Sequence, residues 1–250
     1  MRGKLIVFEG GEGSGKTTQI KRLYDWLGKS EAFNLLQSTG SVLGVKMTRE
    51  PGGNALGQQI RQLLLDERWR RLVDGELPAE APIANRAELL LYAADRAQHV
   101  EETLVPWLEK GYWVLCDRYT DSTVAYQGYG RQLSLSLIGA LNRIATTYCE
   151  GQIDAQLKSD LTFWLNVSPA IGLARMHQRG QADRIEQASQ RFHQRVSEGF
   201  AALAAANGEM AALSSGPTEE IAGDRPIDVI ATHIQTIIHQ RIAQWYPPLL

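Results

Sequence analysis

A glycine-rich segment near the N-terminus constrains this chain more than any other feature. Gly10–Thr17 reads Gly-Gly-Glu-Gly-Ser-Gly-Lys-Thr, and it matches the GxxxxGK[ST] pattern of loops that bind nucleotide phosphates. The apolar run Leu5–Phe8 comes directly before it, and Ile20, Leu23 and Leu27 follow at helical spacing. In a strand–loop–helix unit of this kind, backbone N–H groups and the helix N-terminus bind phosphate oxygens. We therefore expect the chain to bind a nucleoside triphosphate.

The residues of this loop have different expected roles. Lys16 supplies a mobile positive charge for the β- and γ-phosphates, and Thr17 supplies a hydroxyl ligand for Mg²⁺. The segment expected to hold the triphosphate comprises Gly10, Gly11, Glu12, Gly13, Ser14, Gly15, Lys16, Thr17 and Thr18.

Length and charge restrict the class of protein. A chain of 250 residues that is 44% hydrophobic can bury one substantial core, so we expect a single domain over residues 1–250. The 26 basic and 28 acidic residues give a net charge of −2. A chain with this balance has no overall positive field to attract nucleic acid, so we expect no nucleic-acid partner.

Apolar patterning also bears on location. The first strand starts at Lys4, which leaves no room for a signal peptide, and no segment approaches the roughly 18 apolar residues of a membrane span. We expect a soluble cytoplasmic protein without a membrane partner. Cys116 lies in an apolar run, far in sequence from Cys149, so we expect it to be buried rather than disulfide-bonded.

Apolar runs alternate with helical patterns along the chain. The predicted strands are Leu5–Phe8, Val42–Met47, Tyr112–Cys116, Leu161–Val167 and a shorter one at Glu219–Ala222. Alternation of this kind predicts right-handed crossovers and a doubly wound α/β fold with about five parallel strands.

Three further segments have expected structures. Ile227–Ile238 reads as a closing helix, with Asp224 as its N-cap before Pro226. The segments Lys29–Gly40 and Asp66–Asn85 look like surface connections. The short apolar tail that starts at Trp245 is expected to dock on the body of the protein.

Polar segments follow the first three predicted strands. They are Gly10–Thr17, Thr48–Gly53 and Asp117–Tyr119. Ligands of open parallel sheets bind beyond the carboxyl ends of the strands. We therefore expect these segments to form one site.

Arg49 and Asp117–Arg118 are the charged residues of this predicted site. Arg49 follows the second strand, where its planar guanidinium can grip a phosphate; a solvated turn is the alternative. Asp117 ends a buried strand, the position from which an acidic residue organises Mg²⁺ next to a phosphate-binding loop. A surface ion pair between Asp117 and Arg118 fits less well, because successive side chains of a strand point to opposite faces.

Two groups lie farther along the chain. Tyr92 and Arg96 are four residues apart and share a helix face. The ring can stack on a nucleotide base while the guanidinium hydrogen-bonds the carbonyl edge of that base. The alternative is ordinary packing of the ring next to a surface charge. The segment Arg175–Glu186 gathers basic residues around a glycine; it can be a solvated loop or a small mobile lid that carries arginines.

Together these motifs resemble the thymidylate kinase family of P-loop nucleoside monophosphate kinases. The resemblance runs through Gly10–Thr17, Arg49–Gly53, Tyr92–Arg96, Asp117–Tyr119 with Ser122–Gln127, and Asp183–Glu186. The Arg-Glu-Pro-Gly-Gly and Asp-Arg-Tyr motifs are specific, whereas the P-loop alone names only a superfamily. The resemblance implies a P-loop NTPase-like fold with a small lid, a homodimer, and transfer of a phosphoryl group from ATP to dTMP with Mg²⁺.

The resemblance also implies roles for the acceptor-site residues. Arg49 and Arg118 would hold the dTMP phosphate, and Asp117 would organise the magnesium water and this phosphate. Glu12 would bind the 3′-hydroxyl of the sugar. The nucleoside would contact Tyr92 by stacking, Arg96 at its carbonyl edge, Tyr126 on the side of a 2′-hydroxyl, and Thr123 and Gln127 around the base.

The arginine that neutralises the transferred phosphoryl group lies either in the P-loop or in the lid of this family. The P-loop position holds Ser14 here, so the chain resembles the bacterial lid-arginine type. We predict that Arg179, or failing that Arg184 or Arg175, performs this role. His177 stands where this type often carries another arginine.

Two segments are longer than this family usually has. They are Lys29–Gly44 and Thr146–Ser159, and neither interrupts a motif. A kinase for another nucleotide is the nearest alternative, although Tyr92, Arg96 and Tyr126 match a thymine site. A regulatory GTPase would require an Asn-Lys-x-Asp segment, which the sequence lacks, and an inactive nucleotide-binding module is disfavoured by the intact motifs.

Overall fold

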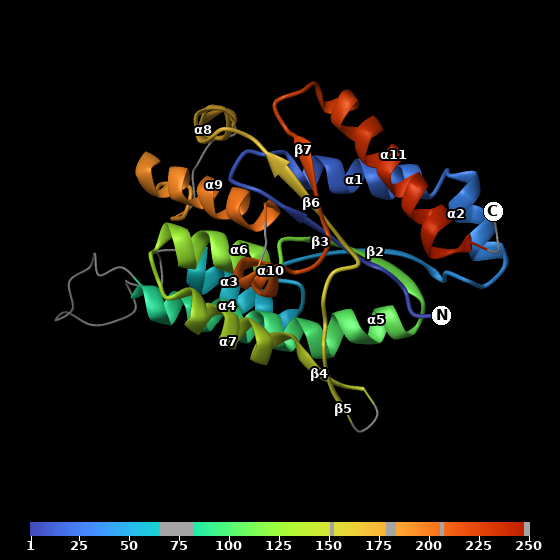
Figure 1. Cartoon of the computed structure of the whole chain (residues 1–250), viewed down its shortest axis with the longest axis horizontal. Coiled ribbons are helices and arrows are strands. Elements are labelled where there is room, and N and C mark those ends of the chain that lie inside the picture. Colours follow the sequence, from blue (N-terminus) through green and yellow to red (C-terminus); the bar gives the residue numbers. More distant parts are fainter. Residues whose placement is uncertain (66–82, 151–152, 179–183, 206–207, 248–250) are drawn as a thin grey trace.

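The computed structural model describes residues 1–65, 83–150, 153–178, 184–205 and 208–247. Its centre is a parallel five-stranded sheet in the order β2-β3-β1-β6-β7 (Figure 1). The strands are β2 (Gly44–Arg49), β3 (Tyr112–Asp117), β1 (Leu5–Glu9), β6 (Leu161–Asn166) and β7 (Thr218–Ala222). The predicted doubly wound sheet is confirmed, with small shifts at the strand ends.

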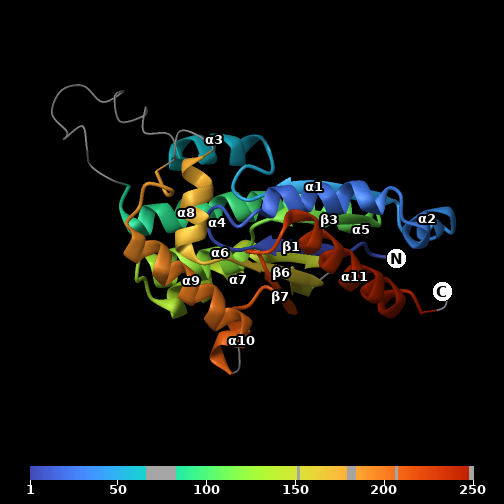
Figure 2. The ribbon, with the colours of Figure 1, turned by 90° about the horizontal axis from the view of Figure 1, so that it is seen from above.

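The side chains of β1 alternate between two hydrophobic cores. Ile6 and Phe8 pack with α1 (Lys16–Leu27) and α11 (Ile227–Trp245) on one face of the sheet. Leu5 and Val7 pack on the other face with η2 (Val100–Leu104) and α5 (Val105–Glu109). Because successive residues of a strand point to opposite faces, a run that is apolar throughout requires helices on both sides, as Figures 1 and 2 show.

The remaining described helices complete the fold. They are α3 (Ala55–Leu65), α4 (Asn85–His99), α6 (Thr120–Thr123), η3 (Val124–Gly130), α7 (Leu135–Thr146), α8 (Pro169–His177), α9 (Gln190–Ala204) and α10 (Glu209–Leu213).

The segment Lys29–Gly40 is not the plain surface connection that we expected. It contains helix α2 (Glu31–Ser38), whose N-terminus is capped by the Ser30 hydroxyl. Phe33 and Leu36 are buried against the core, because their spacing of three places both on one face of the helix. The other predicted connection, Asp66–Asn85, lies mostly outside the described residues, and α4 begins at its last residue, Asn85.

Asp224 does not cap the closing helix as we expected. The N-cap of α11 is Pro226, and no side chain caps it. A residue before proline is disfavoured in helical conformation, so the helix cannot start at Arg225. Asp224 therefore lies too early to serve as the cap, whereas Asp228 is the acidic residue of the first turn.

The described part of the C-terminal segment, which ends at residue 247, packs on the body of the protein as we expected. Tyr246 is 1% exposed, and its hydroxyl accepts a hydrogen bond of 3.1 Å from the indole N–H of Trp113. The rings of Trp113 and Trp245 lie edge to face, 5.4 Å apart. Cys116 is buried and free, as expected.

The longer Thr146–Ser159 segment forms an antiparallel hairpin of β4 (Thr147–Glu150) and β5 (Ile153–Gln156), which projects away from the sheet in Figure 1. Leu157 anchors its return, because its carbonyl accepts a hydrogen bond of 3.0 Å from the buried Tyr119 hydroxyl. No helix in the described part of the chain is sufficiently long and apolar to span a membrane.

Candidate active site

The three polar segments predicted to form one site do lie together. Phe8 and Arg49 are both register partners of Asp117, so the loops after β1, β2 and β3 leave the sheet at one edge. One cleft is lined by Glu12–Thr18, Arg49, Glu50, Arg61, Asp117, Arg118 and Glu186. The structure thus brings the P-loop next to the residues after β2 and β3.

Close packing shapes the P-loop. Gly10 and Gly13 have φ angles of 142° and 67°, and residues other than glycine rarely adopt a positive φ angle. A Cβ at Gly13 would also overlap the carbonyl oxygen of Gly172 in α8. The buried Lys16 ammonium donates to the carbonyl oxygens of Gly10 and Gly11, at 3.0 and 2.9 Å.

Lys16 is expected to limit binding of the nucleoside triphosphate at high pH. Burial and the charge of Arg118 lower its pKa to about 8, against the opposing effect of nearby carboxylates. The charged form is therefore lost as the pH rises through this value. Because kcat/KM reports ionisations of the free enzyme, we expect kcat/KM for the nucleoside triphosphate to fall about tenfold per pH unit above about pH 8.

The matched measurement is kcat at a saturating concentration of the nucleoside triphosphate, across the same pH series and at constant ionic strength. Phosphate oxygens beside Lys16 favour its charged form, so the alkaline limb of kcat should lie at higher pH. A kcat/KM profile that stays level to about pH 10 would contradict this prediction.

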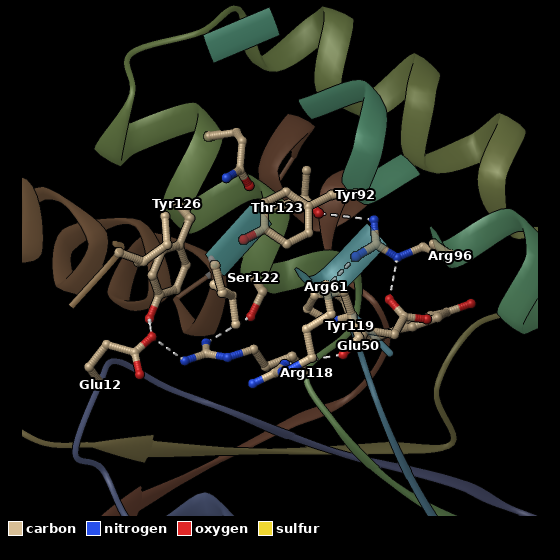
Figure 3. Close-up of a pocket in the computed structure, with 14 residues that line it drawn as sticks. Glu12, Glu50, Arg61, Tyr92, Arg96, Arg118, Tyr119, Ser122, Thr123 and Tyr126 are labelled. Carbon is tan, nitrogen blue, oxygen red and sulfur yellow. Dashed lines mark hydrogen bonds and ion pairs between the residues drawn. The ribbon is translucent and has the colours of Figure 1, made fainter. Parts of the chain in front are cut away.

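Arg118 connects the P-loop to a second pocket. Its φ angle of 72° is left-handed, and its side chain donates to the Gly10 carbonyl at 3.0 Å and to Glu12 at 2.6 Å. Glu12 also accepts a bond of 2.7 Å from the Tyr126 hydroxyl (Figure 3). Burial alone would raise the pKa of Glu12, but Arg118 and Lys16 outweigh it and lower the value to about 2.

Asp117 and Arg118 have different partners rather than forming the surface ion pair considered above. The Thr17 hydroxyl donates to the Asp117 carboxylate at 2.9 Å, whereas Arg118 pairs with Glu12. A hydroxyl next to a carboxylate fits Mg²⁺, which binds few protein oxygens and keeps waters and substrate phosphates as its other ligands. Among the described residues, no three or more His, Cys, Asp or Glu side chains form a cluster suited to a metal ion.

Glu9 is a residue of the site that we did not predict. It is fully buried and accepts hydrogen bonds from the backbone N–H of Tyr119 at 2.7 Å and from the Ser122 hydroxyl at 2.6 Å. Burial and the nearby Asp121 carboxylate raise its pKa to about 7. Glu9 thus fixes Tyr119 and Ser122, which follow Arg118 in the chain. In the sequence, its position at the end of a strand did not distinguish it from an ordinary strand residue.

The second pocket collects the predicted nucleoside-binding residues. Its lining includes Glu12, Tyr92, Arg96, Arg118, Thr123, Tyr126 and Gln127, together with Glu50, Pro51, Leu65, Tyr119, Ser122 and Ile185. Figure 3 shows these side chains around one space. Arg61 of α3 lines both this pocket and the P-loop cleft, and we did not predict it from the sequence.

Arg96 is held more tightly than a simple ligand-binding arginine. It is 2% exposed and donates to Glu50 at 2.8 Å and to the Tyr119 carbonyl at 3.0 Å. Its Nη1 atom donates to Thr123 at 2.9 Å and to Asn142 at 2.8 Å. These bonds use four of its five N–H groups and fix the plane of its guanidinium.

The arginines of the predicted lid are bound to different parts of the protein. Arg175 donates to the carbonyl of Gly223 at 3.0 Å and lies near the P-loop. Arg184 pairs with the buried Glu88 and donates to the Leu64 carbonyl at 2.8 Å. Arg179 lies outside the described residues.

Comparison with known proteins agrees with this arrangement. The family described as "Thymidylate kinase" matches residues 8–224. Thymidylate kinase from Acaryochloris marina is 48% identical over 99% of this chain and 100% of its own length, and that from a Cyanothece species is 49% identical over 99% and 98%. The crystal structure of thymidylate kinase from Ehrlichia chaffeensis has a TM-score of 0.62 and 27% identity over 96% of this chain and all of its own. With its P-loop, Arg-Glu-Pro-Gly-Gly and Asp-Arg-Tyr motifs converging on adjoining pockets, the chain belongs to the thymidylate kinase family.

Proposed function

We propose that the chain transfers the γ-phosphoryl group of ATP to dTMP and produces ADP and dTDP for dTTP synthesis. The observation that carries this proposal is the meeting of two pockets at Glu12 and Arg118, which line both of them. Phosphoryl transfer needs two anions held in line and their charge neutralised more than it needs covalent help. Two adjoining pockets with cationic residues at their junction provide that arrangement.

The donor phosphates bind along Gly10–Thr18 in this proposal. The Lys16 ammonium group gives up its hydrogen bonds to the Gly10 and Gly11 carbonyls and donates to the β- and γ-phosphate oxygens instead. Charged phosphate oxygens are stronger acceptors than carbonyl oxygens. Thr17 and Asp117 hold Mg²⁺, which neutralises charge on the phosphates when bound.

The acceptor phosphate binds between Arg49 and Arg118. Arg49 is exposed at the end of β2 and lines the P-loop cleft. Arg118 lies over the Tyr126 ring, 4.9 Å from its centroid, and a phosphate would compete with Glu12 for its guanidinium. Arg61 lines both pockets and is a further candidate ligand of the same phosphate.

The nucleoside occupies the second pocket. Tyr92 stacks on thymine, Arg96 offers its fifth N–H group to a base carbonyl, and Thr123 and Gln127 line the base. Tyr126 and Glu12 contact the sugar, with the Tyr126 ring on the side where a ribonucleotide carries its 2′-hydroxyl. This pocket favours a deoxynucleotide with a pyrimidine base.

A coupled assay of ADP release tests the function directly. With ATP and Mg²⁺, kcat/KM should be highest for dTMP among dTMP, dUMP, UMP, dCMP, dAMP and dGMP. Omission of Mg²⁺ with added chelator should abolish turnover. If dTMP were no better than dCMP or the purine nucleotides, the proposed substrate would be wrong.

We also propose a homodimer formed through the exposed face of α4. Ala87, Leu90, Ala94 and Gln98 are exposed at spacings of three and four, and Leu90 is 56% exposed. Isolated apolar residues are common on surfaces, but an apolar helix stripe is typical of an interface. The neighbouring α3 and α7 add the exposed Leu63 and Ile144.

Light scattering after size exclusion tests the dimer. Wild-type protein should have twice the mass of the chain, and Leu90→Glu should have the mass of one chain, because it buries a charge in the interface. Val229→Glu is the matched control, since Val229 is 54% exposed on α11 across the sheet. A Leu90→Glu protein that stays dimeric would exclude this face.

The proposed reaction favours a cytoplasmic location, where ATP and dTMP are both available. Recovery of the activity in the membrane-free fraction of a lysate is the expected result, and recovery in the membrane pellet would contradict it.

A further inference from the structure

Three residues of helix α4 hold the loop after β2. The Asp95 carboxylate accepts a bond of 2.9 Å from the backbone N–H of Gly52. Arg96 donates to Glu50 at 2.8 Å, and His99 contacts both Glu50 and Thr48. The proposed role of the loop is to present Arg49 to the acceptor phosphate, so its support by one helix bears on the reaction.

His99 makes the most extensive of these contacts. It is fully buried, with Nδ1 2.9 Å from Glu50 Oε1 and Nε2 2.7 Å from Thr48 Oγ1. A carboxylate only accepts hydrogen bonds, so Nδ1 is the donor to Glu50. In the neutral ring, Nε2 then accepts the proton of the Thr48 hydroxyl. The imidazole thereby bridges two loop residues.

Two glycines after β2 leave space for the side chains of His99 and Asp95. A Cβ at Gly53 would overlap Nε2 of His99, and a Cβ at Gly57 would overlap the Asp95 carboxylate. Neither glycine has a positive φ. The requirement at Gly53 is therefore room for the imidazole rather than conformational freedom.

The position of the two contacts determines what His99 can control. Thr48 and Glu50 are the immediate neighbours of Arg49, so fixing both of them fixes the backbone of Arg49 between them. Glu50 also binds Arg96, which lines the nucleoside pocket. One buried ring thus supports both the proposed phosphate-binding arginine and the proposed base-binding arginine.

We propose that His99 is a positioning residue for dTMP, acting through Thr48 and Glu50 on Arg49 and Arg96. This inference rests on the proposed roles of those two arginines. Loss of the ring lets the loop take other conformations, which weakens the acceptor site, while the ATP phosphates bind to the separate loop after β1.

The test compares three substitutions of His99. Leu removes both polar contacts at similar volume; the Asn amide reproduces the donor at Nδ1, and the Gln amide reaches the position of Nε2. A lost hydrogen bond to a charged group corresponds to about 10–100-fold in affinity. We expect His99→Leu to lower kcat/KM for dTMP by about tenfold or more and to leave the ATP KM within about twofold, with most of the loss restored in His99→Asn.

Two further variants keep the test decisive. His233→Leu is the matched control, because His233 is exposed on α11, and it should behave as wild type. Thr48→Val removes only the hydroxyl partner; if His99→Leu fails to fold, a selective loss for dTMP in Thr48→Val and His99→Gln supports the proposal.

The proposal is overturned if His99→Leu turns over dTMP normally, if it weakens both substrates equally, or if Thr48→Val and His99→Gln are silent. These outcomes differ from failure of the proposed function, in which the wild-type enzyme itself would show no preference for dTMP.

Discussion

A Lys16→Met enzyme is expected to bind dTMP but to lose at least about 10²–10³ of kcat, the usual loss when one preorganised cationic or hydrogen-bonding group is removed from a transition state. Methionine keeps much of the length of the side chain and removes the charge. Lys16 is buried at the P-loop, within reach of the backbone that would hold the phosphates. No other described lysine lines the P-loop cleft, so no lysine there can replace it.

Two measurements separate this effect from misfolding. Titration calorimetry with dTMP should give an affinity close to that of wild type, because the nucleoside pocket does not contain Lys16. Lys21→Met is the control, as Lys21 is exposed on the same helix and should keep full turnover. A Lys16→Met enzyme with near-normal kcat would exclude Lys16 from the transfer step.

An Arg179→Ala enzyme is expected to lose about 10³–10⁵ of kcat with little change in either KM, since arginines that neutralise a transferred phosphoryl group act mainly in the transition state. Arg179 lies outside the described residues, and its assignment comes from the sequence. Of the two described lid arginines, Arg184 pairs with the buried Glu88, and Arg175 donates to the Gly13 and Gly223 carbonyls.

Arg184→Ala is the informative comparison. Glu88 binds Gln127 and Arg131 as well as Arg184. The Arg184→Ala substitution therefore removes one of the partners of Glu88 beside the nucleoside pocket. We expect its effect mainly in the dTMP KM or in thermal stability. If Arg184→Ala instead lost the larger part of kcat and Arg179→Ala kept normal turnover, the two assignments would be exchanged.

Local patterns predicted the sheet and the convergence of its loops. The apolar runs at Leu5–Phe8 and Tyr112–Cys116 are long enough to identify buried strands, and strand direction alone brings their loops to one edge. The same local reasoning missed α2, because it took Lys29–Gly40 for a surface connection and did not use the spacing of Phe33 and Leu36. It also placed a cap at Asp224, although Pro226 prevents the helix from starting so early.

The supporting residues of the site could not be predicted in this way. Glu9 acts on Tyr119 and Ser122, and His99 acts on Thr48 and Glu50. Their partners are distant in sequence and become neighbours only when the sheet and α4 are assembled. Sequence patterns identify residues that contact ligands by their chemical type, whereas residues that hold those side chains in place depend on tertiary geometry.

The packing of the P-loop against α8 restricts which residues the two segments can carry. Gly13 and Gly172 each lack space for even a methyl group, because each would collide with the other's segment. The backbones of the two segments are therefore in direct contact. A residue larger than glycine at either position would push the nucleotide loop and the start of α8 apart, so the shape of the phosphate-binding loop depends on a helix that follows it by some 150 residues.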